Sequence, residues 1–98
     1  MRQSTFVTLV DATRRTAPQG RLYGGWRRGQ AQFYDITVLM PDKREVCWTG
    51  LVPRMPDPGM KARMVGGGFP GDWAALVINT ANSDSESVCW PAVPITER

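Results

Sequence analysis

The clearest pattern in the chain is an alternation of apolar and polar positions over residues 32–40. It would place four apolar side chains on one face of an extended segment, namely Tyr34, Ile36, Val38 and Met40. Alternation with a period of two residues is typical of a strand that is buried on one side. Asp35 and Thr37 fall on the opposite face, which we therefore expect to be exposed to solvent.

A second alternating segment over residues 45–52 would turn Trp48 inward and Thr49 outward. The residues between the two segments, Met40-Pro41-Asp42-Lys43, are typical of a type I turn, because proline presets the backbone at the second position. We predict that residues 32–52 form a β-hairpin.

Three further segments have strand character because they are short, apolar and bounded by turn residues, namely residues 5–10, 73–79 and 88–95. For residues 73–79 a helix capped by Asp72 is the alternative, and the β-branched Val77 and Ile78 favour the strand. A polar loop is expected from residue 11 to residue 20. Residues 66–71 are rich in glycine and must form another loop. Residues 58–65 are ambiguous: Asp57-Pro58 could cap about two turns of helix, and a short strand fits almost as well. The expected fold is all-β, a small barrel or sandwich of five or six short strands, with one short helix near 58–65 as an alternative.

Composition limits both the size and the chemistry of the protein. A chain of 98 residues has room for one core, so we expect one β-rich domain over residues 1–98. The chain has no histidine, which excludes Ser-His-Asp triads, Cys-His pairs and His-ligated zinc. The acidic residues form no pair that suggests acid and base catalysis. We predict a non-enzymatic protein with no metal and no cofactor.

Charge is concentrated near the N-terminus. Residues 1–30 hold six arginines and only one acid, Asp11, which gives a local balance of 6 − 1 = +5 against +3 for the whole chain. Neither the start of the chain nor its longest apolar run, residues 73–78, resembles a signal sequence or a membrane span. We therefore expect a cytoplasmic protein without membrane contact, in which both cysteines are structural thiols.

Residues 13–30 carry the strongest functional signal in the chain. This segment has five arginines, two aromatic residues, four glycines and no acid. Arginine binds phosphate through two parallel hydrogen bonds, aromatic rings stack on bases, and glycine lets the backbone approach a ligand closely. The candidate site residues are therefore Arg14, Arg15, Arg21, Tyr23, Trp26, Arg27 and Arg28, and the expected partner is RNA or single-stranded DNA.

Two other interpretations of this segment stay open. The arginines could pair with acids elsewhere in a solvated loop, while the two aromatic residues pack on the core. Alternatively, the same tryptophan and arginine surface, or the loops over residues 53–70, could bind an acidic protein surface. In that case the protein would be an inhibitor or adaptor that occludes part of another protein.

The triplet Val-Cys-Trp occurs twice, at residues 46–48 and 88–90, with Val-Pro following in both copies. A duplicated hairpin and chance both explain it. If the duplication is real, Cys47 and Cys89 should occupy equivalent positions. Trp48, Trp73 and Trp90 lie in or at the start of strand segments and are expected in the core, while Trp26, between glycine and arginine, is expected to be exposed.

Overall fold

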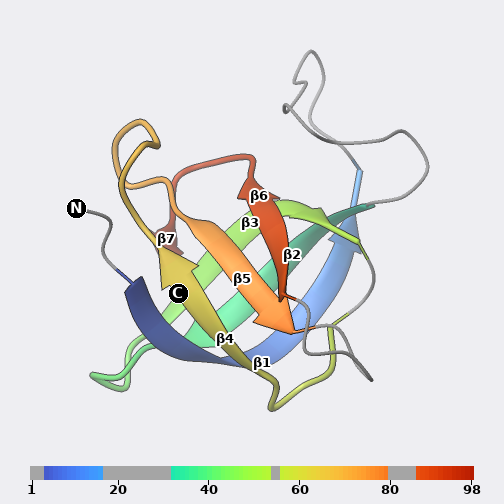
Figure 1. The fold of residues 1–98 in the computed structure, drawn as a ribbon. Coiled ribbons are helices and arrows are strands. Elements are labelled where there is room, and N and C mark those ends of the chain that lie inside the picture. The colour runs from blue at the N-terminus through green and yellow to red at the C-terminus, as the bar shows by residue number, and fades with distance from the viewer. Residues whose placement is uncertain (1–3, 17–31, 54–55, 80–85) are drawn as a thin grey trace.

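The computed structural model describes residues 4–16, 32–53, 56–79 and 86–98, and these form a single antiparallel sheet that closes on itself (Figure 1). Its strands are β1 (Ser4–Arg15), β2 (Gln32–Leu39), β3 (Glu45–Val52), β4 (Lys61–Val65), β5 (Ala75–Asn79), β6 (Glu86–Pro91) and β7 (Thr96–Glu97). Around the ring the order is β1-β2-β3-β6-β5-β4 and back to β1, while β7 pairs only with β3. The all-β prediction is confirmed, and the described residues contain no helix.

The predicted hairpin is present as β2 and β3, which pair over their full lengths from Gln32 opposite Val52 to Leu39 opposite Glu45. The turn is closed by the amide of Lys43, which donates to the carbonyl oxygen of Met40 at 3.0 Å. Lys43 has a φ of 73°, so it takes the left-handed conformation that often follows a turn in hairpins with longer loops. The predicted boundaries of this element are confirmed.

Strand β1 is longer than the sequence indicated. The polar loop expected from Asp11 is wrong for Asp11–Arg15, because this stretch pairs with β2 as far as Arg15 opposite Phe33. Its alternation was hidden because Ala12 is the only apolar side chain among these residues, and it packs against the core. A bulge between Leu9 and Asp11 lets the first half of β1 pair with β4 and the second half with β2.

The helix considered for residues 58–65 is wrong, and the strand alternative is confirmed as β4. The amide of Met60 donates to the carbonyl oxygen of Asp57 at 3.2 Å, and Gly59 has a φ of 85°, so the chain makes a tight turn there. Beyond the turn Ala62 and Met64 point into the core. Their backbone is held by ladders to β1 and β5 on either side, which a helix could not provide.

Trp48 fills the interior of the barrel. It is fully buried, and its indole Nε1 donates to the carbonyl oxygen of Ala74 at 2.6 Å, which satisfies its only polar group. The inward-facing side chains of the ring strands surround it, among them Ile36, Leu76 and Cys89. The predicted inward positions of the hairpin are therefore confirmed.

The outer face of the hairpin differs from the prediction, because much of it is covered. Phe33, Leu51 and Ala92 form a second apolar cluster with Val93 packed against it. Thr37 and Thr49 were expected to be exposed and are only 2% and 4% accessible. The sequence pattern of the hairpin could not show this, because the chain after β6 belongs to the cover.

Strand β6 ends earlier than predicted, at Pro91, and the backbone pairs again only at β7. The two Val-Cys-Trp triplets lie in opposite phase, so Cys47 and Cys89 do not occupy the equivalent positions that a duplicated hairpin would give them. In β3 the valine and tryptophan point inward and Cys47 is only partly buried, whereas in β6 Cys89 is buried and Trp90 is 37% exposed. Trp90 was expected in the core, and this prediction is wrong.

Candidate binding surfaces

Arg14 and Arg15 lie at the C-terminal end of β1. Residues 13–30, which we call the Arg/aromatic segment, begin here. Together with Thr16 they line a shallow surface pocket, whose other side is formed by Gln32 and Phe33 at the start of β2. Both arginines are exposed. The structure thus brings two of the predicted site residues together at one rim of the barrel.

Arg15 has a partner within the protein. Its guanidinium lies 3.1 Å from a carboxylate oxygen of Asp35, which also accepts a hydrogen bond from the hydroxyl of Thr49 at 2.5 Å. Among the described residues no carboxylate lies within ion-pair distance of Arg14. The interpretation that these arginines pair with acids elsewhere therefore applies to Arg15, and not to Arg14 within the described part of the chain.

The other predicted site residues, Arg21, Tyr23, Trp26, Arg27 and Arg28, lie outside the described residues. Their position in the chain places them in the connection from β1 to β2. The predicted site therefore extends from a rim that the structure describes, and its function stays a prediction.

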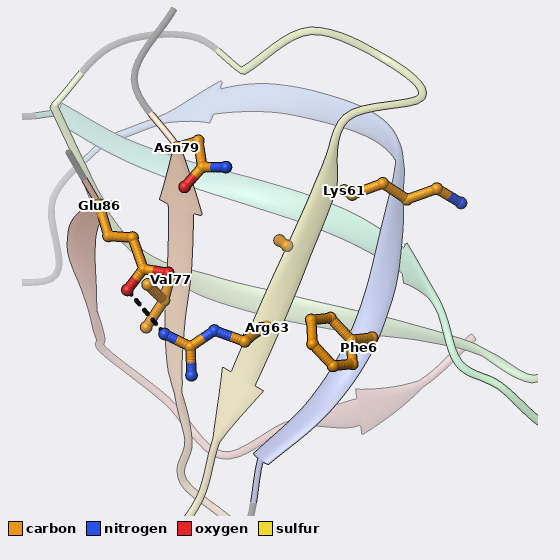
Figure 2. Close-up of a pocket in the computed structure, with 7 residues that line it drawn as sticks. Phe6, Lys61, Arg63, Val77, Asn79 and Glu86 are labelled. Atoms are coloured by element: carbon orange, nitrogen blue, oxygen red, sulfur yellow. Dashed lines mark hydrogen bonds and ion pairs between the residues drawn. The ribbon is translucent and has the colours of Figure 1, made fainter. Parts of the chain in front are cut away.

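A second surface, which the sequence analysis missed, covers the outside of β1, β4, β5 and β6. Strand register puts Phe6 beside Arg63, Arg63 beside Val77, and Val77 beside Val88 in one row across the four strands. Phe6 is 72% exposed and Val88 49%. Figure 2 shows Arg63 extending between the Phe6 ring and Glu86 on this face. We call it the outer apolar face.

One end of the outer apolar face is hollowed into a groove of about 590 Å³. Its aliphatic lining comes from Val65, Ala75, Val77 and Val88. Phe69, in the glycine-rich loop after β4, packs against Trp90 with ring centroids 6.1 Å apart and planes at 62°. The two rings form an aromatic wall at this end of the groove.

The charges on this face are arranged unequally. Arg63 donates to a carboxylate oxygen of Glu86 at 2.7 Å, so these two charges neutralise each other (Figure 2). Lys61 donates to the hydroxyl of Thr8 at 2.9 Å, which carries no charge. Among the described residues Lys61 has no ion-pair partner, so the polar end of the face carries one uncompensated positive charge.

Sequence reasoning missed the outer apolar face because its outward residues alternate along each strand with inward residues that are also apolar. The sequence therefore does not show which side faces the solvent. In β6, Val88 and Trp90 point outward while Cys89 points inward, and the pattern permits either phase. In β5, Val77 lies between Leu76 and Ile78, so no polar residue marks the outer side. The only available signal was Phe6 in a segment where Val7 and Leu9 already supply the inward side.

Cys89 does not lie in a reactive setting of the kind used in catalysis. Both are free thiols, and burial raises the pKa of Cys89 to about 12. A thiol with so high a pKa stays protonated and is a poor nucleophile. Within the described part of the chain no three metal-ligating side chains come together, and no helix is long and apolar enough to cross a membrane.

Comparison of the chain with protein-family models, curated proteins and solved structures gives no match.

Proposed function

We propose that this protein is a non-enzymatic binding module, which holds RNA or single-stranded DNA with the basic connection between β1 and β2. The observation that supports this most directly is the position of Arg14 and Arg15 at the end of β1. Because Arg14 and Arg15 pair with Tyr34 and Phe33 of β2, this end of the strand presents both cations from a fixed point. The remaining arginines and both aromatic residues of the segment follow directly in the chain.

Arg14 and Arg15 are suited to phosphate. The guanidinium of Arg14 has no acidic partner among the described residues, so binding a phosphate there breaks no ion pair. The ion pair of Arg15 with Asp35 is partly exposed, and such pairs contribute only about 0–1 kcal/mol. A phosphate can therefore replace Asp35 at little cost, and Asp35 competes with it for Arg15.

The arrangement of the strands gives further support by analogy. In OB-folds, which are small Greek-key barrels, the loop between the first two strands takes part in binding oligonucleotides. In this barrel the Arg/aromatic segment occupies the same place in the strand order. The arginine and aromatic side chains of the segment supply the chemistry that binds phosphates and bases.

The test is oligonucleotide binding by fluorescence anisotropy, with a labelled oligothymidylate of about 20 nucleotides, longer than the roughly 4–16 that one small barrel covers. Replacing Arg14 and Arg15 by alanine should weaken binding and reduce the slope of log affinity against log salt by up to about 1.4, since each contact contributes about 0.7. Arg44→Ala is the matched control. Arg44 is engaged by Asp42 and Glu97 at the opposite end of the hairpin, so its loss should leave the slope unchanged.

Asp35→Asn provides a second arm with the opposite sign. Asparagine keeps an acceptor for the Thr49 hydroxyl but removes the charge that competes for Arg15. We therefore expect Asp35→Asn to raise the affinity for oligothymidylate. An unchanged or lower affinity in this variant, or equal losses in the Arg44→Ala and Arg14/Arg15 variants, would contradict the proposed site.

A further inference from the structure

We propose that the outer apolar face is a docking site for a short extended segment of a partner protein, one that carries an apolar side chain and an acidic residue. This inference is independent of nucleic-acid binding, because it concerns β4, β5 and β6 rather than the connection from β1 to β2. The groove between Phe69, Trp90 and Arg63 receives the apolar side chain. Lys61 attracts the acidic residue at the other end of the face.

The lining of the groove favours a protein over a nucleic acid. Its surface is aliphatic as well as aromatic, with Val65, Val77 and Val88 between the Phe69–Trp90 wall and the ion pair. Aliphatic side chains provide dispersion contacts for an apolar residue, and they do not stack with bases as aromatic rings do. Arg63 and Glu86 both line the groove and neutralise each other, so the groove offers no net positive charge to a phosphate. Trp and Arg, which both line the groove, are enriched among protein-binding hot spots.

The size of the face favours a short segment over a second copy of this chain. Strands in a sheet lie about 4.8 Å apart and same-face residues about 6.7 Å apart, so four strands of three outward positions cover roughly 400 Å² with side chains included. A stable protein interface buries about 800 Å² on each partner. The face is half of that area, whereas a few extended residues fit it.

Charge complementarity sets the preferred sequence of the partner. Arg63 and Glu86 neutralise each other across β4 and β6, while the only partner of Lys61 among the described residues is the neutral Thr8 hydroxyl. The face therefore attracts one negative charge. Since Lys61 and the groove lie at opposite ends of β4, the acidic and apolar residues of the bound segment should be separated along its sequence by about four positions.

The experiment uses a random peptide library displayed on phage, selected against the full-length protein, so that the protein chooses the chemistry. Enriched peptides should combine a large apolar residue with Asp or Glu. The affinity of a synthetic copy of an enriched peptide is then measured for matched pairs of variants. Val88→Ser should lower it about tenfold, because it removes an aliphatic side chain that the bound segment would bury in the groove. Val10→Ser, at a similarly exposed valine of β1 outside the groove, should leave it within twofold.

The charge is tested with the two lysines of the chain. Lys61→Gln should abolish the preference for an acidic residue, whereas Lys43→Gln, in the turn between β2 and β3, should not change it. The proposal is wrong if no peptide is enriched, if the enriched peptides are basic, or if Val10→Ser and Val88→Ser act alike. It is also wrong if sedimentation shows a dimer that Val88→Ser dissociates. Oligothymidylate binding that Val88→Ser weakens tenfold would assign the face to nucleic acid instead.

Discussion

Gly50 is the position at which the barrel closes, and its replacement by alanine should weaken the fold strongly. It lies in β3 opposite Pro91 of β6, in one of the two residue pairs that join these strands. A Cβ at this position would overlap the carbonyl oxygen of Trp90 and come within 2.6 Å of the Trp48 indole. The first is a backbone atom and the second belongs to the largest buried side chain, so neither can move away without separating β3 from β6 or displacing the core.

The expected magnitude follows from two opposing effects. Overpacking a core costs about 1–3 kcal/mol, and we take the upper end because a backbone atom is involved. Alanine also restricts the unfolded chain, which offsets about 0.4–1 kcal/mol. The free energy of unfolding should therefore fall by about 2 kcal/mol, equivalent to a Tm lower by about 8–16 °C for a domain of this size.

Gly66→Ala is the matched control for this prediction. No atom lies within 4 Å of a Cβ built at Gly66, and its φ is not in the left-handed range. The control should be neutral or stabilised by up to about 1 kcal/mol. Urea unfolding followed by tryptophan fluorescence measures both variants. A Gly50→Ala protein that loses less than about 1 kcal/mol, or no more than Gly66→Ala, would refute the closure argument.

Three further outcomes are expected. A thiol reagent at about pH 8 should label Cys47 and leave Cys89 unmodified until urea unfolds the protein, because burial raises the pKa of Cys89 to about 12; equal labelling rates would contradict this. Folding raises that pKa, so the stability contributed by the neutral Cys89 thiol is complete below about pH 9 and is lost as the pH rises toward 12. Between these pH values the urea midpoint of wild type should therefore fall, and that of Cys89→Ala should fall less. Thr37→Val should leave the free energy of unfolding unchanged or raise it by about 1 kcal/mol, because the buried Thr37 hydroxyl has no hydrogen-bond partner among the described residues. A clear loss of stability in urea unfolding would show that the hydroxyl is bonded.

The sequence predicted the hairpin of β2 and β3 well because its register depends on local information. Alternation from Tyr34 to Val38 sets the buried side, and the proline turn sets the connection. The prediction became weaker where a local sequence signal disagreed with the strand pairing of the fold. Asp57-Pro58 resembles a helix start, but the backbone of β4 is satisfied by β1, which is distant in sequence, and by β5. This pairing outweighed the local preference.

Only one of the two candidate surfaces could be predicted from the sequence. The Arg/aromatic segment was found because its composition is unusual at any position in a fold. The outer apolar face was missed because exposure depends on which strands are neighbours. Trp90 was expected in the core by its size and apolar character, and only the phase of β6 against β5 shows that Cys89 takes the inward place.

The dependence of oligonucleotide affinity on salt tests the central claim most directly. For wild type, log affinity for oligothymidylate should fall linearly with log salt, with a slope of about 0.7 for each arginine that contacts a phosphate. Replacing Arg27 and Arg28 by alanine should reduce that slope by about 1.4, whereas Trp26→Ala should weaken binding by about 1–3 kcal/mol and leave the slope nearly unchanged, because stacking releases few ions. No measurable binding by wild type at about 50 mM salt, where electrostatic contacts are strong, would contradict the account.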